Sequence, residues 1–138
     1  MKKVSLFLFF FSSSILLYSQ HYTRADSLRG NLTPIRNCYD VTFYELDIKV
    51  DEQEKLIRYS SNTIYFIALS DFKKLQIDLA LNMEILSIDF EGAELDFYRE
   101  FNAVYVHFNR LIQKGEKSMI KVFYSGHPRE AVNPPWDG

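Results

Sequence analysis

Residues 44–50 read YELDIKV, and this stretch decides the fold class because apolar and charged residues alternate along it. Successive side chains of a β-strand point to opposite faces, so a period of two indicates a strand with one buried face and one wet face. Tyr44, Leu46, Ile48 and Val50 are therefore expected to point into a core. The charged residues between them are expected to face water.

The same alternation recurs along the rest of the chain. We expect further strands at roughly 56–69, 75–79, 86–90, 95–97, 104–108 and 120–124, separated by charged or glycine-containing turns at 51–55, 91–93 and 113–116. Short strands with turns about every ten residues favour an antiparallel β-sandwich. Segment 69–81 is the best helical rival, but its centre, LQIDL, alternates too regularly for a helix.

The sequence therefore predicts an all-β fold with a core built from the apolar member of each alternating pair. The expected inward positions are Leu46, Ile48, Val50, Ile64, Phe66, Leu75, Ile77, Leu79, Leu86, Ile88, Phe90, Val104, Val106, Phe108, Ile120 and Val122.

The N-terminus has the anatomy of a secretory signal peptide. Lys2 and Lys3 precede an apolar run over 4–17, and Ser19 supplies a small residue before a cleavage point. We expect residues 1–19 to be removed, which makes the protein exported, either periplasmic or extracellular, with no stable membrane span. The alternative is an uncleaved membrane anchor, but the apolar run is short for one. Residues 20–38 form a polar lead-in segment, and 39–138 form the β-sandwich domain.

Composition narrows the functional classes. The chain has 138 residues, a formal net charge of −2 and a single cysteine, Cys38. One domain fits this length, the absence of a basic excess argues against nucleic acid as a partner, and an unpaired cysteine excludes an internal disulfide framework.

Catalytic chemistry is scarce in this sequence. The only histidines are His21, His107 and His127, and no His-Glu-x-x-His segment is present. His107 alternates with buried-type residues, so it is expected on the wet face of its strand. Cys38 has no base beside it in the sequence and is interpreted as a small residue at a strand entrance. We therefore expect no catalytic residue, no metal ligand and no cofactor in this chain.

Three other patterns admit a functional and a structural interpretation. An acidic run could bind calcium, and it consists of Asp89, Glu91, Glu94, Asp96 and Glu100. Its spacing is not that of an EF-hand, so the solvent-exposed face of a hairpin is the favoured explanation. Asn31-Leu32-Thr33 fits a glycosylation acceptor. Four aromatic residues could form a ligand platform, although cross-strand packing is preferred: Phe43, Tyr59, Tyr65 and Tyr105.

Two stretches near the ends of the chain carry the most specific residues. The first stretch contains YTRADSLRG at 22–30 and YDVTFYELDI at 39–48, and the second runs from 124 to 138 as YSGHPREAVNPPWDG. The residues that carry the pattern are Arg24, Asp26, Arg29, Gly30, Tyr39, Asp40, Asp78, Pro128, Pro135 and Trp136. Together these stretches resemble the N-terminal domain of exported bacterial zinc aminopeptidases of the aminopeptidase N type, the gluzincins.

The resemblance implies a saddle-like β-sandwich that precedes a thermolysin-like catalytic domain. In the family that later domain holds zinc on a His-Glu-x-x-His helix and hydrolyses N-terminal residues from peptides. The chain stops before any of those positions, so it is expected to be truncated and inactive alone, with the downstream catalytic domain as its missing partner. The alternative is a free-standing exported β-sandwich that binds a protein or a glycan.

One departure from the family pattern is visible. The family usually has a glycine shortly after the position of Ile57, which allows a kinked strand. Arg58-Tyr59-Ser60-Ser61 stands there instead, so no glycine supplies the bend.

Overall fold

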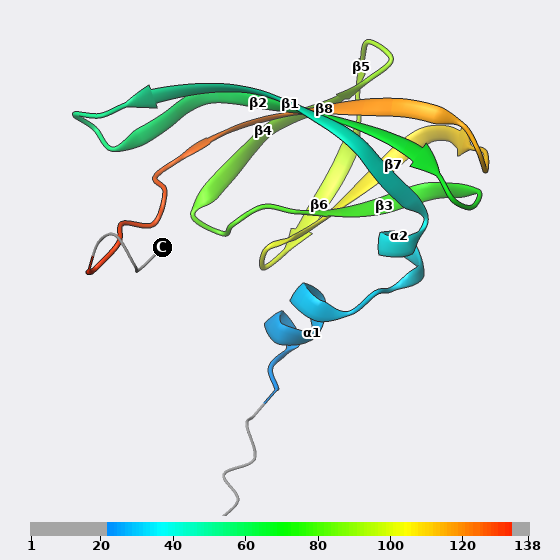
Figure 1. Cartoon of the computed structure of the whole chain (residues 1–138), viewed down its shortest axis with the longest axis horizontal. Coiled ribbons are helices and arrows are strands. Elements are labelled where there is room, and N and C mark those ends of the chain that lie inside the picture. The colour runs from blue at the N-terminus through cyan, green and yellow to red at the C-terminus, as the bar shows by residue number, and fades with distance from the viewer. Residues whose placement is uncertain (1–21, 134–138) are drawn as a thin grey trace, which may run out of the picture.

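Two antiparallel β-sheets face each other in the computed structural model, which describes residues 22–133, and two short helices lie at one end (Figure 1). The large sheet has the order β1 (Tyr39–Asp51), β2 (Leu56–Ala68), β8 (Lys117–Gly126), β4 (Met83–Phe90) and β5 (Ala93–Glu94). The small sheet has the order β3 (Phe72–Asp78), β7 (Ala103–Ile112) and β6 (Asp96–Glu100). The predicted all-β sandwich is confirmed. The predicted signal peptide at 1–19, His21, Pro135 and Trp136 lie outside the described residues.

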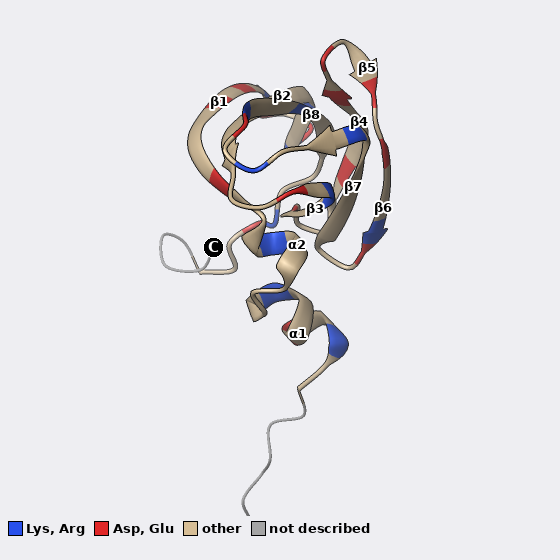
Figure 2. Cartoon of the chain, turned by 90° about the vertical axis from the view of Figure 1, so that its right-hand side faces the viewer, with Lys and Arg blue, Asp and Glu red and all other residues tan. Residues whose placement is uncertain are grey.

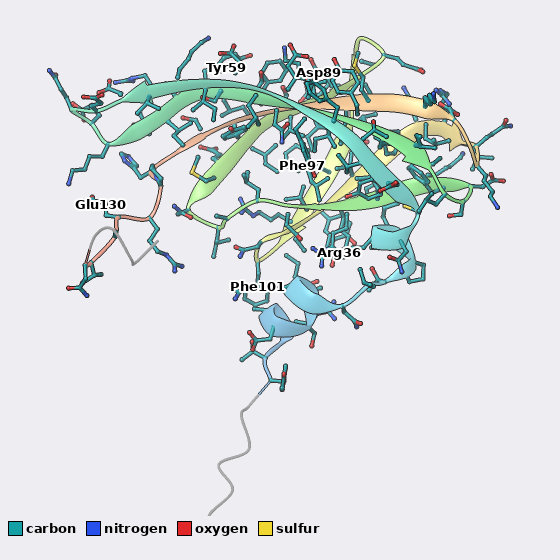
Figure 3. The ribbon with its side chains drawn as sticks, viewed as in Figure 1. Arg36, Tyr59, Asp89, Phe97, Phe101 and Glu130 are labelled. Atoms are coloured by element: carbon teal, nitrogen blue, oxygen red, sulfur yellow. The ribbon has the colours of Figure 1, made fainter. Side chains whose placement is uncertain are left out.

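The core lies between the two sheets and is dominated by aromatic rings. Phe108 of β7 is 6% exposed and packs edge-to-face against Phe66, Phe72 and Phe90, at centroid distances of 6.4, 5.5 and 4.9 Å. Edge-to-face rings add attraction beyond the area that they bury. Phe97 from β6 also points between the sheets (Figure 3).

The core prediction was wrong for β1. Tyr44 and Leu46 pair with Ile64 and Asn62, so they lie on the inner face of the large sheet, as predicted. Nevertheless the apolar residues of this face are about half exposed: Tyr44 53%, Leu46 57%, Ile48 48% and Val50 66%. The reason is that β1 is the edge strand of the large sheet and its hairpin with β2 extends beyond the small sheet (Figure 1), so no second layer built from residues 22–133 covers these side chains. We call Tyr44, Leu46, Ile48 and Val50 the β1 inner stripe.

A second misplaced core residue is Leu86, which is 38% exposed. The β4–β8 register shifts between Ile85 and Ser87. Such an irregularity changes which face later residues occupy, so Met83 lies inward before it and Ile88 lies inward after it. The alternation in the sequence does not reveal the shift.

The lead-in segment is helical. α1 (Arg24–Gly30) begins at Thr23, whose hydroxyl and backbone form a capping box with Asp26, and α2 (Pro34–Asn37) begins with a proline. Leu28 of α1 is buried with Ala103 and Tyr105 on the outer face of the small sheet.

β2 carries a bulge at the point where the resemblance places a bend, and no glycine stands there. In β2 an extra residue interrupts the register with both neighbouring strands, between Ile57 and Ser61. Ser60 is fully buried, its Oγ accepts a hydrogen bond from the backbone N–H of Lys49 at 2.8 Å, and the same hydroxyl donates to the carbonyl of Arg58 at 2.8 Å. A side-chain hydroxyl therefore satisfies two backbone groups that the bulge releases from the ladder.

Candidate functional site

The family-like residues near the N-terminus gather where the helices meet the small sheet. Arg24 of α1 makes a two-point contact with the carboxylate of Glu100 on β6, at 2.8 and 3.1 Å. Asp78 at the end of β3 forms an ion pair with Arg36 of α2 and accepts a hydrogen bond from Gln76 at 3.0 Å. These ion pairs join the basic residues of the two helices to the acidic ends of two strands (Figure 2).

Tyr39 completes this anchor from the start of β1. Its hydroxyl donates to the backbone carbonyl of Gln76 at 2.7 Å, and the amide of Gln76 donates to the carbonyl of Leu28 at 3.4 Å. Burial removes the water that would stabilise a phenolate, which raises the pKa of Tyr39 to about 12. The neighbouring thiol of Cys38 is buried too, and its pKa is raised to about 11 for the same reason.

The other motif residues of this region serve the backbone. Asp26 caps α1, the carbonyl of Arg29 accepts a hydrogen bond from Arg36 at 2.7 Å, and Gly30 is the last residue of α1. Asp40 is exposed on β1. This half of the motif fastens the lead-in segment to the small sheet and presents no activated nucleophile or general base.

The second motif stretch governs how the chain leaves β8. Gly126 has φ +148°, and a Cβ built on it would lie 2.6 Å from the carbonyl oxygen of Asn82, so the position requires glycine. The next residue, His127, accepts a hydrogen bond from the side chain of Asn82 at its carbonyl, and its Nδ1 lies 3.2 Å from the carbonyl of Lys55. Pro128 then lies against a cavity at the open end of the sandwich.

That cavity lies between β2, β3, β4 and the residues that follow β8. It has a volume of about 430 Å³ and is lined mainly by apolar side chains, including Ile57, Ile77 and Met83, with Arg129 beside Pro128. A second hollow of about 560 Å³ lies toward α2 and shares Asn62, Ile64, Ile77 and Asp78 with the first. The Oδ1 atom of Asn62 is buried there without a hydrogen-bond partner in the described chain.

The structure separates the remaining candidates. His107 is exposed on the outer face of the small sheet near Tyr98, at a ring distance of 5.6 Å, whereas His127 lies at the exit of β8. Glu91 pairs with Arg110 and Glu100 pairs with Arg24, which agrees with a solvated acidic face. Within residues 22–133 no group of three His, Cys, Asp or Glu side chains could hold a metal ion. The residues described therefore do not fit a zinc site.

The four aromatic residues do not form one platform. Phe43 packs on Tyr65 and Tyr59 stacks on Phe123, both on the outer face of the large sheet, where Figure 3 shows Tyr59. Tyr105 belongs to the small sheet, is 5% exposed and stacks on Tyr98. Cross-strand packing, the favoured interpretation, describes all three pairs.

Sequence reasoning missed the cavity and the open end of the sandwich. Alternation in residues 44–50 predicted which sheet face each side chain occupies. The sequence did not indicate how far the small sheet extends across that face. In residues 22–133 the structure contains no helix long and apolar enough to cross a membrane.

Comparison with known proteins defines the fold class. No protein-family model and no curated protein matches the sequence. The arrangement of strands is nevertheless shared with part of the M1 zinc metallopeptidases of known structure.

The similar structures include an M1 zinc metallopeptidase from Deinococcus radiodurans, with a TM-score of 0.60, 19% identity and coverage of 72% of this chain. A mutant of a two-domain M1 zinc metallopeptidase bound to L-tryptophan matches equally well. A mutant from Deinococcus radiodurans bound to a Tyr-Ser-Ala substrate matches at 20% identity over 73% of this chain. The chain spans only 23% of the length of each of these proteins.

Proposed function

We propose that this chain is the N-terminal, non-catalytic β-domain of an M1-type zinc aminopeptidase that removes N-terminal residues from peptides. The observation that carries the proposal is the shared fold: nearly three quarters of this chain superposes on about a quarter of a zinc metallopeptidase. Zinc and the reacting groups then belong to polypeptide beyond Gly138. When bound there, zinc would supply an activated water for attack on a peptide carbonyl.

The described residues support a scaffolding role. The anchor of Arg24, Arg36, Tyr39, Asp78 and Glu100 fixes the helices on the small sheet through charge-assisted and backbone hydrogen bonds. The aromatic core fixes one sheet against the other. Such a rigid sandwich can hold a neighbouring domain in place without touching substrate chemically.

We also propose that the protein is exported to the periplasm or the extracellular space. The support is the sequence of residues 1–19, with its basic start, apolar centre and small residue before the cleavage point. Cell fractionation with mass spectrometry of the N-terminus would test this, and a protein that retains Met1 and stays in the cytoplasmic fraction would contradict it.

The functional proposal is tested by comparing two products of the gene. Residues 20–138, purified alone, should neither retain zinc in metal analysis nor hydrolyse aminoacyl reporter substrates. A product that continues beyond Gly138 should do both, and a chelator should abolish its activity. Chelator-sensitive turnover by residues 20–138 would refute the scaffold assignment. A stop codon directly after Gly138, with a soluble monomeric product, would favour the free-standing binding module.

A further inference from the structure

The outer face of the large sheet carries two exposed aromatic pairs with a row of polar side chains between them. This face points away from the small sheet, and Figure 3 shows Tyr59 and Asp89 on it. Phe43 is 61% exposed and Tyr59 is 57% exposed. We propose that this face binds a neutral polysaccharide whose sugar rings have apolar C–H faces. The inference goes beyond the proposed function and does not depend on it, because the described residues form the face by themselves.

Strand register arranges the side chains of this face in three rows across the sheet. The first row consists of Phe43, Tyr65 and Met119, the second of Glu45, Thr63, Lys121 and Asp89, and the third of Asp47, Ser61, Phe123 and Ser87. Phe43 and Tyr65 form the first aromatic pair, at a centroid distance of 5.7 Å, and Tyr59 stacks on Phe123 at 5.4 Å to form the second. The first and third rows are four residues apart along β2, which is about 13 Å. An extended ligand chain lying along the strands would therefore meet one pair after the other.

The exposed rings offer surfaces for the apolar side of a sugar. A pyranose with equatorial hydroxyls directs its C–H bonds toward the two faces of the ring, so each face is apolar while the rim is polar. The face of an aromatic ring is negatively polarised and attracts such C–H groups. Cross-strand packing explains how the rings of each pair contact each other, but it leaves more than half of the surface of Phe43 and of Tyr59 exposed.

Hydrogen-bonding groups lie between and beside the two pairs. The hydroxyl of Tyr65 donates to the carboxylate of Glu45 at 3.0 Å, which holds this acceptor beside the first pair. The ammonium groups of Lys49 and Lys121 lie 6.0 and 5.2 Å from ring centroids of the second pair. A hollow of about 540 Å³, lined in part by Tyr65 and Met119, adds depth beside the first row. Ligand sites of this kind combine apolar surface with a few placed polar groups.

The charges of this face disfavour other classes of ligand. Acidic Glu45, Asp47 and Asp89 accompany basic Lys49 and Lys121, so the face has no basic excess for a nucleic acid or an anionic lipid surface. A protein interface has a centre depleted in charge and a polar rim. Here the charged row lies in the centre, between the aromatic pairs. A neutral polysaccharide, which combines apolar ring faces with hydroxyl rims, fits this order better.

Affinity gel electrophoresis of the secreted form of the 138-residue chain tests the proposal. The neutral probes are barley β-glucan, hydroxyethylcellulose and arabinoxylan, and the anionic control is alginate. Phe43→Ala and Tyr59→Ala each remove one exposed ring, whereas Tyr59→Phe retains the ring. Tyr44→Ala is the matched control, because Tyr44 is 53% exposed on the same sheet but belongs to the β1 inner stripe on the opposite face. Circular dichroism confirms that each variant is folded.

We expect at least one neutral polysaccharide to retard the wild-type chain, while alginate does not. Phe43→Ala and Tyr59→Ala should each raise the dissociation constant by about fivefold or more, because each loses one aromatic contact, whereas Tyr59→Phe and Tyr44→Ala keep the wild-type value. Mobility unchanged by all three neutral probes would overturn the inference. Retardation by alginate alone would overturn it as well, and so would an equal loss of binding in Tyr44→Ala.

The result is independent of the aminopeptidase proposal. Polysaccharide binding is measured on the chain itself and needs neither zinc nor peptide hydrolysis. A product beyond Gly138 that lacks peptidase activity would refute the aminopeptidase assignment and leave the binding result unchanged. Failure of all the neutral probes would refute the binding site and leave the assignment unchanged.

Discussion

Truncation of Phe108 should separate the energetics of the core from those of the outer face. Phe108→Ala removes a side chain that is 6% exposed and contacts three other rings. Loss of transfer energy and formation of a cavity together cost about 3–5 kcal/mol for a buried phenylalanine. We expect the upper half of this range, because the three neighbouring rings belong to different strands, β2, β3 and β4. Strands held in two sheets cannot all shift to fill the cavity that the missing ring leaves.

Phe43→Ala is the matched control. Phe43 is 61% exposed, so only about 40% of its surface is buried. Full burial of such a side chain is worth roughly 1.5–3 kcal/mol. The expected cost is therefore about 0.6–1.2 kcal/mol, and no internal cavity forms.

Urea unfolding followed by circular dichroism measures the difference. With a slope of about 1.5 kcal/mol/M, the midpoint should fall by roughly 2.7–3.3 M for Phe108→Ala and by less than about 0.8 M for Phe43→Ala. Phe108→Leu, with an expected loss of roughly 1–2 kcal/mol, keeps the comparison readable if the alanine variant does not fold. Equal midpoint shifts for the variants at 108 and 43 would refute the assignment of the core to the space between the sheets.

Three further measurements address the backbone, the charges and the thiol. Gly126→Ala should lower the free energy of unfolding by roughly 1–3 kcal/mol, because its Cβ would meet the backbone of Asn82 at 2.6 Å; an unchanged urea midpoint would show that the exit of β8 is not constrained as described. Hydrogen bonds from Arg110 hold the pKa of Glu116 below its ordinary value of 4.5, so this pair stabilises the fold above that value and its contribution is lost as the pH falls through the lowered pKa. The difference in urea midpoint between wild type and Arg110→Gln should therefore shrink between about pH 6 and pH 3, and a difference that grows on acidification would contradict the pairing. Cys38, whose pKa rises from 9.0 to about 11, should have about 100-fold less thiolate than an ordinary cysteine at pH 8, so its reaction with a disulfide reagent should accelerate at least that much on unfolding; rapid reaction in the native state would contradict its burial.

The strands could be predicted because their signal is local. Alternation located β1, β2, β3, β7 and β8 to within a few residues, since side-chain period is a property of each strand alone. The extent of the second layer is not local. Leu46 and Ile64 have the same pattern and the same sheet face, yet one is 57% exposed and the other 6%, because β1 is the edge strand of the large sheet and β2 lies one strand further in.

The helices left a readable signal in the form of caps. Thr23 stands three residues before Asp26, and Pro34 follows Thr33, which are both patterns of helix starts. A search for helical periodicity could not find elements of seven and four residues. The role of the motif residues was also out of reach, because Tyr39 and Gln76 lie 37 positions apart in sequence and meet only through the fold.

The serine at position 60 changes how curvature is encoded in this sheet. Glycine bends a strand by permitting unusual dihedral angles, but none of the described residues with positive φ lies between 56 and 61. Here the Ser60 hydroxyl accepts a hydrogen bond from the amide of Lys49 and donates one to the carbonyl of Arg58. Two hydrogen bonds, and not the conformational freedom of glycine, therefore stabilise the bulge. A sequence search that requires glycine wherever a strand carries a bulge would overlook positions, such as Ser60, where a hydroxyl satisfies the released backbone groups.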